Sequence, residues 1–172
     1  MSLSIAEAKI FGFPEYLPTI LAQSRLKIWR EIYEQNRHRV YSLAFWMTDN
    51  ELTAEEVMIQ AFSRAFAQSG QPTPDDIDST LISEVRQYAP LGTLSLSCAP
   101  CDRVVAVRRN TRRVDLERAV IQLPATEKLM FLMHDVESYD HAHIARLLEM
   151  TEDQARAGVH QARLRLRELL AN

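Results

Sequence analysis

Residues 151–170, TEDQARAGVHQARLRLRELL, decide the fold of this chain. Their apolar side chains recur at positions 155, 159, 162, 166 and 169, in alternating steps of four and three residues. This spacing places one apolar stripe along a helix and leaves its other faces to water or to a partner. Thr151 and Gln154 have the spacing of a capping box, which predicts that the helix begins at this point.

A shorter helix is predicted just upstream. Ile144, Ala145, Leu147 and Leu148 give an apolar face, and Asp140 precedes it as a candidate N-cap residue. A turn of about three residues separates the two predicted helices, as in a helix-turn-helix module. In that module the second helix enters the major groove of DNA, so the pattern favours a DNA-binding unit.

A series of residues around this helix pair keeps a characteristic spacing without gaps: Leu123-Pro124, Phe131-Leu132, Asp135-Val136-Glu137, Ile144-Ala145, Leu147-Leu148, Thr151, His160, Ala162-Arg163 and Leu166. With this spacing the segment resembles region 4 of the sigma-70 family of transcription factors, specifically of its extracytoplasmic-function group. The resemblance implies that the last helix reads the upstream promoter element.

The residues expected nearest to the bases lie in the first half of that helix: Gln154, Arg156, Ala157, His160 and Gln161. Arginine pairs well with guanine and glutamine with adenine in the major groove, while His160 is equally consistent with a plain surface position. For Arg163, Arg165 and Arg167 two interpretations stay open, a solvated helix face and contact with DNA.

Two features of this helix depart from the family. Its first turn carries Glu152 and Asp153, where family members usually have neutral residues. These carboxylates suit the helix dipole but would face phosphates. Gly158 stands where the family usually has a basic residue, and it costs about 1 kcal/mol of helix stability.

Composition predicts an all-α protein. The chain has 172 residues, 47% of them hydrophobic, and only four glycines. We expect two small helical domains, at residues 19–89 and 114–172, joined by an irregular linker at 90–113. No apolar stretch approaches the roughly 20 residues that cross a bilayer, and the N-terminus lacks a signal-peptide pattern. We therefore expect a cytoplasmic protein that makes no membrane contact.

The front part contains two long helical patterns. The first covers about residues 19–48, because apolar and aromatic residues recur there at helical intervals. The second is predicted to begin at a capping box formed by Thr53 and Glu56, after a turn at 49–52, and to run to about Gln68.

The run Ala54–Phe66, AEEVMIQAFSRAF, resembles the core of sigma region 2, and the preceding residues resemble the helix before it. The resemblance implies that Glu55, Glu56 and Gln60 contact the clamp helices of core RNA polymerase. An alternative stays open, because glutamates are common in a first helical turn for dipole reasons alone. The family usually has Gln-Glu where this chain has Ile59-Gln60, which removes one charge.

A third helix is predicted to begin at Thr73, with Pro74 in its first turn and an apolar stripe formed by Ile77, Leu81, Val85 and Tyr88. In the family this segment melts the promoter with aromatic, arginine and asparagine residues, which residues 81–88 match poorly. Arg86 and Tyr88 are the candidates to touch a phosphate or an unpaired base. Because Tyr88 shares the apolar stripe, a core position is the favoured interpretation for it.

The formal charge of −3 is unevenly distributed. Five arginines stand between residues 91 and 113 against a single aspartate. Among them Arg108, Arg109, Arg112 and Arg113 form a cluster just before region 4. Such a cluster can neutralise phosphates or can be a solvated charge run in a tether, and the two interpretations are equally open.

Cys98 and Cys101 form the only cysteine pair, at CxxC spacing. The favoured interpretation is that the pair has no special role; redox sensing and half of a zinc site are the alternatives. No further metal ligands stand at a recognised spacing, so we expect no metal site.

The sequence shows no catalytic constellation, and we predict no enzyme activity, no cofactor and no small-molecule substrate. The leading hypothesis is an alternative sigma factor that binds core RNA polymerase and promoter DNA, with an anti-sigma factor as a further partner. The alternatives are a sigma-like interaction protein that has lost promoter melting, and a homodimeric helix-turn-helix regulator.

Overall fold

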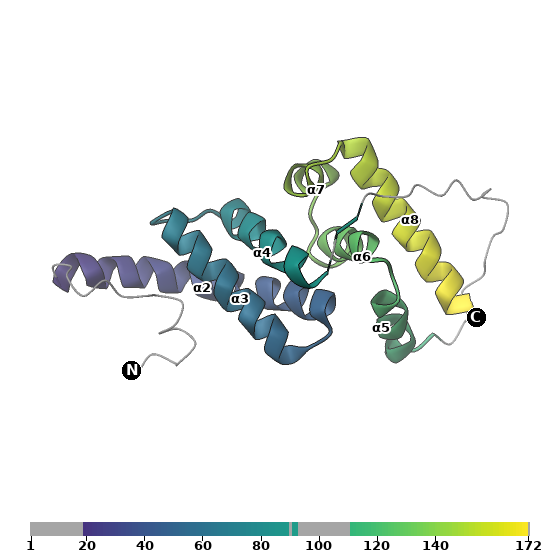
Figure 1. Ribbon diagram of the computed structural model, residues 1–172, viewed down its shortest axis with the longest axis horizontal. Coiled ribbons are helices and arrows are strands. Elements are labelled where there is room, and N and C mark those ends of the chain that lie inside the picture. Colours follow the sequence, from purple (N-terminus) through teal and green to yellow (C-terminus); the bar gives the residue numbers. More distant parts are fainter. Residues whose placement is uncertain (1–18, 90, 93–110, 172) are drawn as a thin grey trace. The chain divides into compact units, whose positions relative to one another are not determined.

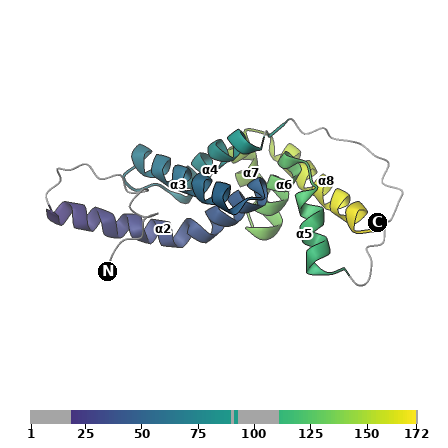
Figure 2. The ribbon, with the colours of Figure 1, turned by 60° about the horizontal axis from the view of Figure 1, so that its bottom comes forward.

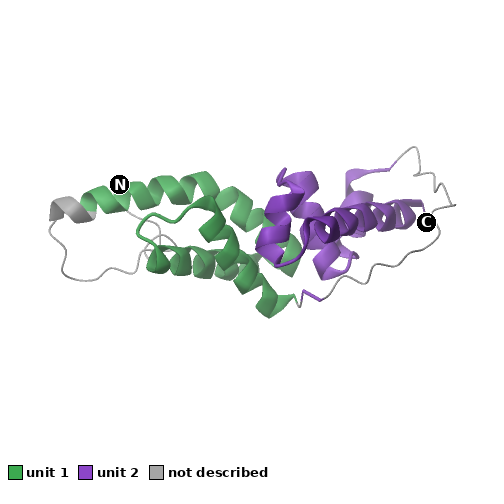
Figure 3. Ribbon diagram, turned by 90° about the horizontal axis from the view of Figure 1, so that it is seen from above, with its two compact units in different colours: residues 1–89 green, residues 90–172 purple. Residues whose placement is uncertain are grey.

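The computed structural model describes residues 19–89, 91–92 and 111–171, and all regular structure within these ranges is helical (Figure 1). The all-α prediction is confirmed. The chain divides into two compact units, residues 1–89 and 90–172 (Figure 3). Within the described ranges, no helix combines the length and apolar character that a membrane span requires.

The described part of unit 1, residues 19–89, contains three helices that pack on one another: α2 (Thr19–Thr48), α3 (Glu51–Gln68) and α4 (Pro74–Tyr88). The first turns of α2 extend beyond the other two helices (Figure 2). Aromatic contacts join α2 to α3: Trp29 stacks on Phe66 at 4.9 Å between ring centroids, and Tyr33 meets Phe62 edge-on at 5.0 Å. The predicted first helix, 19–48, is confirmed.

Buried polar groups tie α2 to α4. Arg39 pairs with Asp78, whose side chain is 3% exposed, and Arg39 Nη2 also donates to Asn36 Oδ1 at 2.7 Å. Asn36 in turn donates to the Ile32 carbonyl. A buried carboxylate is tolerated when it is paired, so Arg39 helps to stabilise Asp78 in the core.

The start of α3 differs from the prediction. The N-cap residue is Asn50, whose side chain accepts a hydrogen bond from the Thr53 amide at 3.0 Å, so α3 begins at Glu51. The predicted start at Thr53 is wrong. The side-chain oxygen of Asn50 accepts the hydrogen bond from the Thr53 backbone N–H, so the N-cap residue lies three positions earlier than predicted. Residues 51 and 52 therefore belong to the helix, and Leu52 is 77% exposed on it.

The start of α4 is as predicted. The Thr73 amide donates to Asp76 Oδ2 at 2.8 Å and the Asp76 amide donates to Thr73 Oγ1 at 3.2 Å, which forms a capping box. These hydrogen bonds lower the pKa of Asp76. Ile77, Leu81 and Val85 are buried as expected, but Tyr88 is 46% exposed, so its predicted core position is wrong.

Unit 2 contains α5 (Arg113–Ile121), α6 (Ala125–Phe131), a π-helical turn η1 (Leu132–Val136), α7 (His141–Leu148) and α8 (Glu152–Ala171). Helix α8 packs against α5, α6 and α7, so it is the centre of this unit. The π turn closes with a hydrogen bond from the Glu137 amide to the Leu132 carbonyl at 3.0 Å. The sequence pattern did not predict it.

Candidate nucleic-acid interface

Helices α7 and α8 are joined by the three residues 149–151. Asp140 caps α7 by accepting from the His143 amide at 2.6 Å, as predicted. Glu149 ends α7 in the left-handed region, with φ 57°. The Thr151 amide then donates to Gln154 Oε1 at 2.8 Å, and the Gln154 amide donates to Thr151 Oγ1 at 3.2 Å. The predicted capping box and helix start are confirmed.

Helix α8 buries one stripe and exposes the opposite face. Ala155, Val159, Ala162 and Leu166 are buried, in the predicted spacing. His160 is exposed and Ala157 is half-buried, so both lie off the packed stripe in the first half of the helix. The fold therefore presents the part of α8 that a helix-turn-helix module places against base edges.

The first turn of α8 is an internal ion-pair cluster. Arg156 Nη2 lies 2.8 Å from Glu152 Oε1, and Arg156 Nη1 lies 3.7 Å from Asp153 Oδ1. All three side chains are at least half exposed, so these contacts are weak and readily exchanged. DNA would have to compete with two carboxylates for Arg156.

Three other candidate side chains of α8 are turned toward the unit itself. Arg163 makes a two-point contact with Asp135 of η1, with its Nε 3.0 Å from Oδ2. Arg165 makes a two-point contact with Glu127 of α6, at 2.9 and 3.2 Å. Gln161 Nε2 also donates to Glu127, at 3.2 Å. The Arg163 and Arg165 side chains remain 45% and 40% exposed, and each is also paired with a carboxylate from another element of unit 2.

The basic cluster before α5 is described only in part. Arg112 pairs with Asp115 at 3.2 Å, which raises the pKa of Arg112 and lowers that of Asp115, and Arg113 pairs with Glu117 at 2.7 Å. Arg108, Arg109, Cys98 and Cys101 lie outside the described residues. Arg86 is exposed on α4, in unit 1.

Histidines gather beside the start of α8. His134 of η1 and His141 of α7 meet edge-to-face, with 4.4 Å between ring centroids. Burial lowers the pKa of His141, and the positive charges of His134, Arg156 and Arg163 lower it further. Among the described residues, no three His, Cys, Asp or Glu side chains come together in a way that could hold a metal ion.

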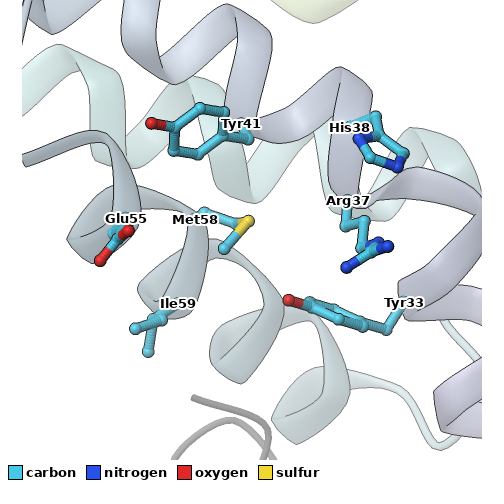
Figure 4. A pocket seen from close by; sticks show the side chains of 7 residues that line it. All are labelled: Tyr33, Arg37, His38, Tyr41, Glu55, Met58 and Ile59. Atoms are coloured by element: carbon cyan, nitrogen blue, oxygen red, sulfur yellow. The ribbon is translucent and has the colours of Figure 1, made fainter. Parts of the chain in front are cut away.

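Unit 1 carries a hollow of about 230 Å³ between α2 and α3. Tyr33, Arg37, His38 and Tyr41 line it from α2, and Glu55, Met58 and Ile59 line it from α3. Figure 4 shows Glu55 at one side and the basic Arg37 and His38 at the other, with Met58 between them. The predicted residues Glu55, Glu56 and Gln60 are all exposed on α3, within about one and a half turns of helix.

The sequence reasoning did not single out Glu127 as a partner of α8. Glu127 and Asp135 lie 38 and 28 residues before their arginines, so local spacing carries no signal for these pairs. The pairs Glu152–Arg156 and Arg113–Glu117 have the i, i+4 spacing that favours helical ion pairs, and the sequence could have revealed them.

Unit 2 thus has the capped helix pair, the tight turn and the exposed second helix of a helix-turn-helix DNA-binding fold. Residues 113–166 match the family described as "Sigma-70, region 4". Across 167 residues the chain is 25% identical to "ECF RNA polymerase sigma factor SigE" of Mycolicibacterium smegmatis. That match covers 87% of this chain and 64% of the relative. The chain is thus similar to a sigma factor of the extracytoplasmic-function (ECF) group over most of its length, and its residues 113–166 match region 4 of the sigma-70 family.

Proposed function

We propose that the chain acts as an alternative sigma factor that directs transcription initiation in the bacterial cytoplasm. The observation that carries the proposal is the match of residues 113–166 to region 4, on a helix pair whose caps, turn and exposed helix suit DNA recognition. In this proposal α8 reads the upstream promoter element, with Gln154, Arg156, Ala157 and His160 nearest the bases.

Unit 1 would dock on core RNA polymerase through the exposed side of α3. Leu52, Glu55, Glu56 and Gln60 give this face one exposed apolar side chain, two carboxylates and an amide. The neighbouring hollow between α2 and α3 could receive a side chain of the polymerase. Binding energy at both units supplies the driving force, so the proposal needs no chemical step and no cofactor.

The direct test is reconstitution of the chain with core polymerase, followed by run-off transcription. We expect the full chain to bind core and to start transcription at its own promoters. A double variant, Glu55→Lys with Glu56→Lys, should lose core binding. Glu31→Lys, an exposed charge reversal on α2, is the matched control and should keep it. Failure of the wild-type chain to bind core would refute the proposal.

A second candidate function is a sigma-like interaction protein that no longer opens promoters. The exposed or half-exposed side chains of α4 favour it, because they include Asp75, Asp76, Ser79 and Ser83, with Arg86 near the end of the helix. Carboxylates and hydroxyls there offer little to a single DNA strand, which binds to basic grooves and aromatic platforms. The half-exposed Tyr88 is the one aromatic side chain of α4.

The two functions differ in their need for open DNA. A chain that melts promoters supports run-off transcription from fully paired templates. A chain that binds core without melting would be active only on templates with a pre-opened bubble, or inactive on both. The same reconstituted polymerase therefore distinguishes them. An anti-sigma factor would compete for either form, and co-purification from the source cell would identify it.

A further inference from the structure

Two partly exposed arginines in the middle of α8 pair with carboxylates from other elements of unit 2. Asp135 holds Arg163, and Glu127 holds Arg165. Each guanidinium makes two contacts, which is the planar geometry that gives arginine–carboxylate pairs their strength and direction. The Glu127 side chain is only 7% exposed, so this carboxylate faces the protein and not the solvent.

The two pairs lie on opposite flanks of the buried stripe of α8. Residues 163 and 165 are two positions apart, so they point about 200° apart around a helix of 3.6 residues per turn. Between them Ala162 and Leu166 face the core. Gln161 adds a further hydrogen bond to Glu127 on the Arg165 side. A helix that makes a two-point arginine–carboxylate contact on each flank resists rotation about its own axis.

We propose that Glu127 and Asp135 are positioning residues that set the rotation of α8, and that Arg163 and Arg165 serve as struts and not as phosphate contacts. This inference rests on the proposed DNA-reading function of α8. Rotation matters because the side chains nearest the bases, at 154, 156, 157 and 160, lie one to three turns before the struts on the same rigid helix. A small rotation moves all of them relative to the groove together.

Charge supports the same assignment. The hydrogen bonds that Arg163 donates to Asp135 raise the pKa of Arg163, and the carboxylate offsets the guanidinium charge that would otherwise attract a phosphate. Arg167 offers a contrast, since it is exposed and makes no ion pair within the described residues. It is therefore the α8 arginine best placed to act as a phosphate contact.

The decisive substitution is Asp135→Asn in the full chain, because the two roles of Arg163 predict opposite signs. If Arg163 is a strut, the variant loosens α8 and weakens binding to the duplex that the wild-type chain enriches from a random-sequence library, by about fivefold. If Arg163 is a phosphate contact, removing Asp135 frees a positive charge, so binding becomes tighter. Glu168→Gln, an exposed carboxylate on the same helix, is the matched control for the lost negative charge.

The salt dependence of DNA binding distinguishes the two roles of Arg163. Loss of a phosphate contact changes this dependence, whereas loss of a purely structural contact does not. Loss of one phosphate contact lowers the slope of log K against log salt by about 0.9. Arg163→Gln should weaken binding and leave that slope unchanged, whereas Arg167→Gln should reduce it. The exchanged pair, Asp135→Arg with Arg163→Asp, should recover part of the lost affinity because the pair is restored with reversed direction.

Hydrogen exchange of the α8 amides tests the inference without DNA. Faster exchange across residues 155–166 in Asp135→Asn and Glu127→Gln, partly reversed in the exchanged pair, is the expected result. Tighter DNA binding, a steeper salt slope and unchanged exchange in Asp135→Asn would overturn the inference. If the wild-type chain enriches no duplex, the proposed DNA function fails, while the exchange measurement still decides whether these carboxylates hold α8.

Discussion

Replacement of Glu152 by Gln at the start of α8 should raise affinity for DNA while lowering the stability of unit 2. Glu152 is 51% exposed and pairs with Arg156 at 2.8 Å. With α8 in the major groove, as proposed, the substitution removes a negative charge near the phosphates, and it frees the Arg156 guanidinium to contact a phosphate or a guanine. It also removes a carboxylate that suits the amino-terminal end of the helix.

The expected gain can be worked out from Coulomb's law. A charge about 8 Å from a phosphate in water interacts by about 0.5 kcal/mol, and screening at physiological salt reduces this to about 0.2 kcal/mol. Two or three phosphates lie within reach of a major-groove helix, so relief of repulsion gives about 0.5 kcal/mol. With the freed Arg156 the total is about 0.5–1.5 kcal/mol, or about a two- to tenfold gain in affinity.

Fluorescence anisotropy with the enriched duplex measures the affinity, and thermal unfolding followed by circular dichroism measures the stability. Loss of the dipole interaction and of the i, i+4 pair should cost about 1 kcal/mol, which lowers Tm by about 4–8 °C for a unit of this size. Glu168→Gln is the control, because it lies about 24 Å along the helix, roughly three Debye lengths away. Unchanged or weaker DNA binding by Glu152→Gln would refute the reasoning.

Four further predictions concern stability. Ile144→Ala removes a fully buried side chain from α7 and should destabilise unit 2 by about 2–5 kcal/mol in urea unfolding. Asn50→Ala removes the α3 cap and should cost about 1 kcal/mol in the same assay, whereas Thr53→Val should cost less if Asn50 is the true cap. Glu149→Gly removes the backbone strain of a non-glycine residue in the left-handed region. It should stabilise unit 2 by on the order of 1 kcal/mol and raise its Tm by several degrees. Because burial and nearby positive charge lower the pKa of His141, the unfolded state binds the proton more readily, so stability should fall as the pH drops below about 6.5 and level off below the folded-state pKa. His141→Gln should remove that part of the pH dependence, and an unchanged profile would contradict the assignment.

Local signals predicted the helix boundaries well where a single residue can supply the cap. Asp140, Thr73 and the Thr151–Gln154 pair all cap the helices that the pattern assigned to them. The start of α3 was missed because Asn50 and Thr53 both have capping side chains within one turn. Only the folded backbone shows that Asn50 accepts the hydrogen bond, while Thr53 donates it.

Features that depend on tertiary packing were not readable from the pattern. Tyr88 shares its stripe with Leu81 and Val85, yet it lies on the last turn of α4 and is 46% exposed. The π turn η1 adds a residue to a helical turn, and the spacing of apolar residues in the sequence does not reveal this insertion. Likewise, the carboxylates that bind Arg163 and Arg165 come from elements that only the fold brings beside α8.

The candidate site was predicted as a region more accurately than as a set of side chains. The helix pair and its exposed face follow from the spacing of apolar residues, which fixes which side of α8 is buried. The state of each polar residue depends instead on its neighbours. Gln154 is engaged in the cap, Gln161 donates to Glu127, and Arg156 is held by two carboxylates.

The account depends most on the claim that the first turns of α8 read base edges. The most direct measurement is sequence selection from a random duplex library with the wild-type chain and with Arg156→Ala. The account predicts that the wild-type chain enriches a defined motif and that Arg156→Ala loses the preference at one guanine position while keeping the rest. Identical motifs for the two proteins, or no motif for the wild-type chain, would contradict it.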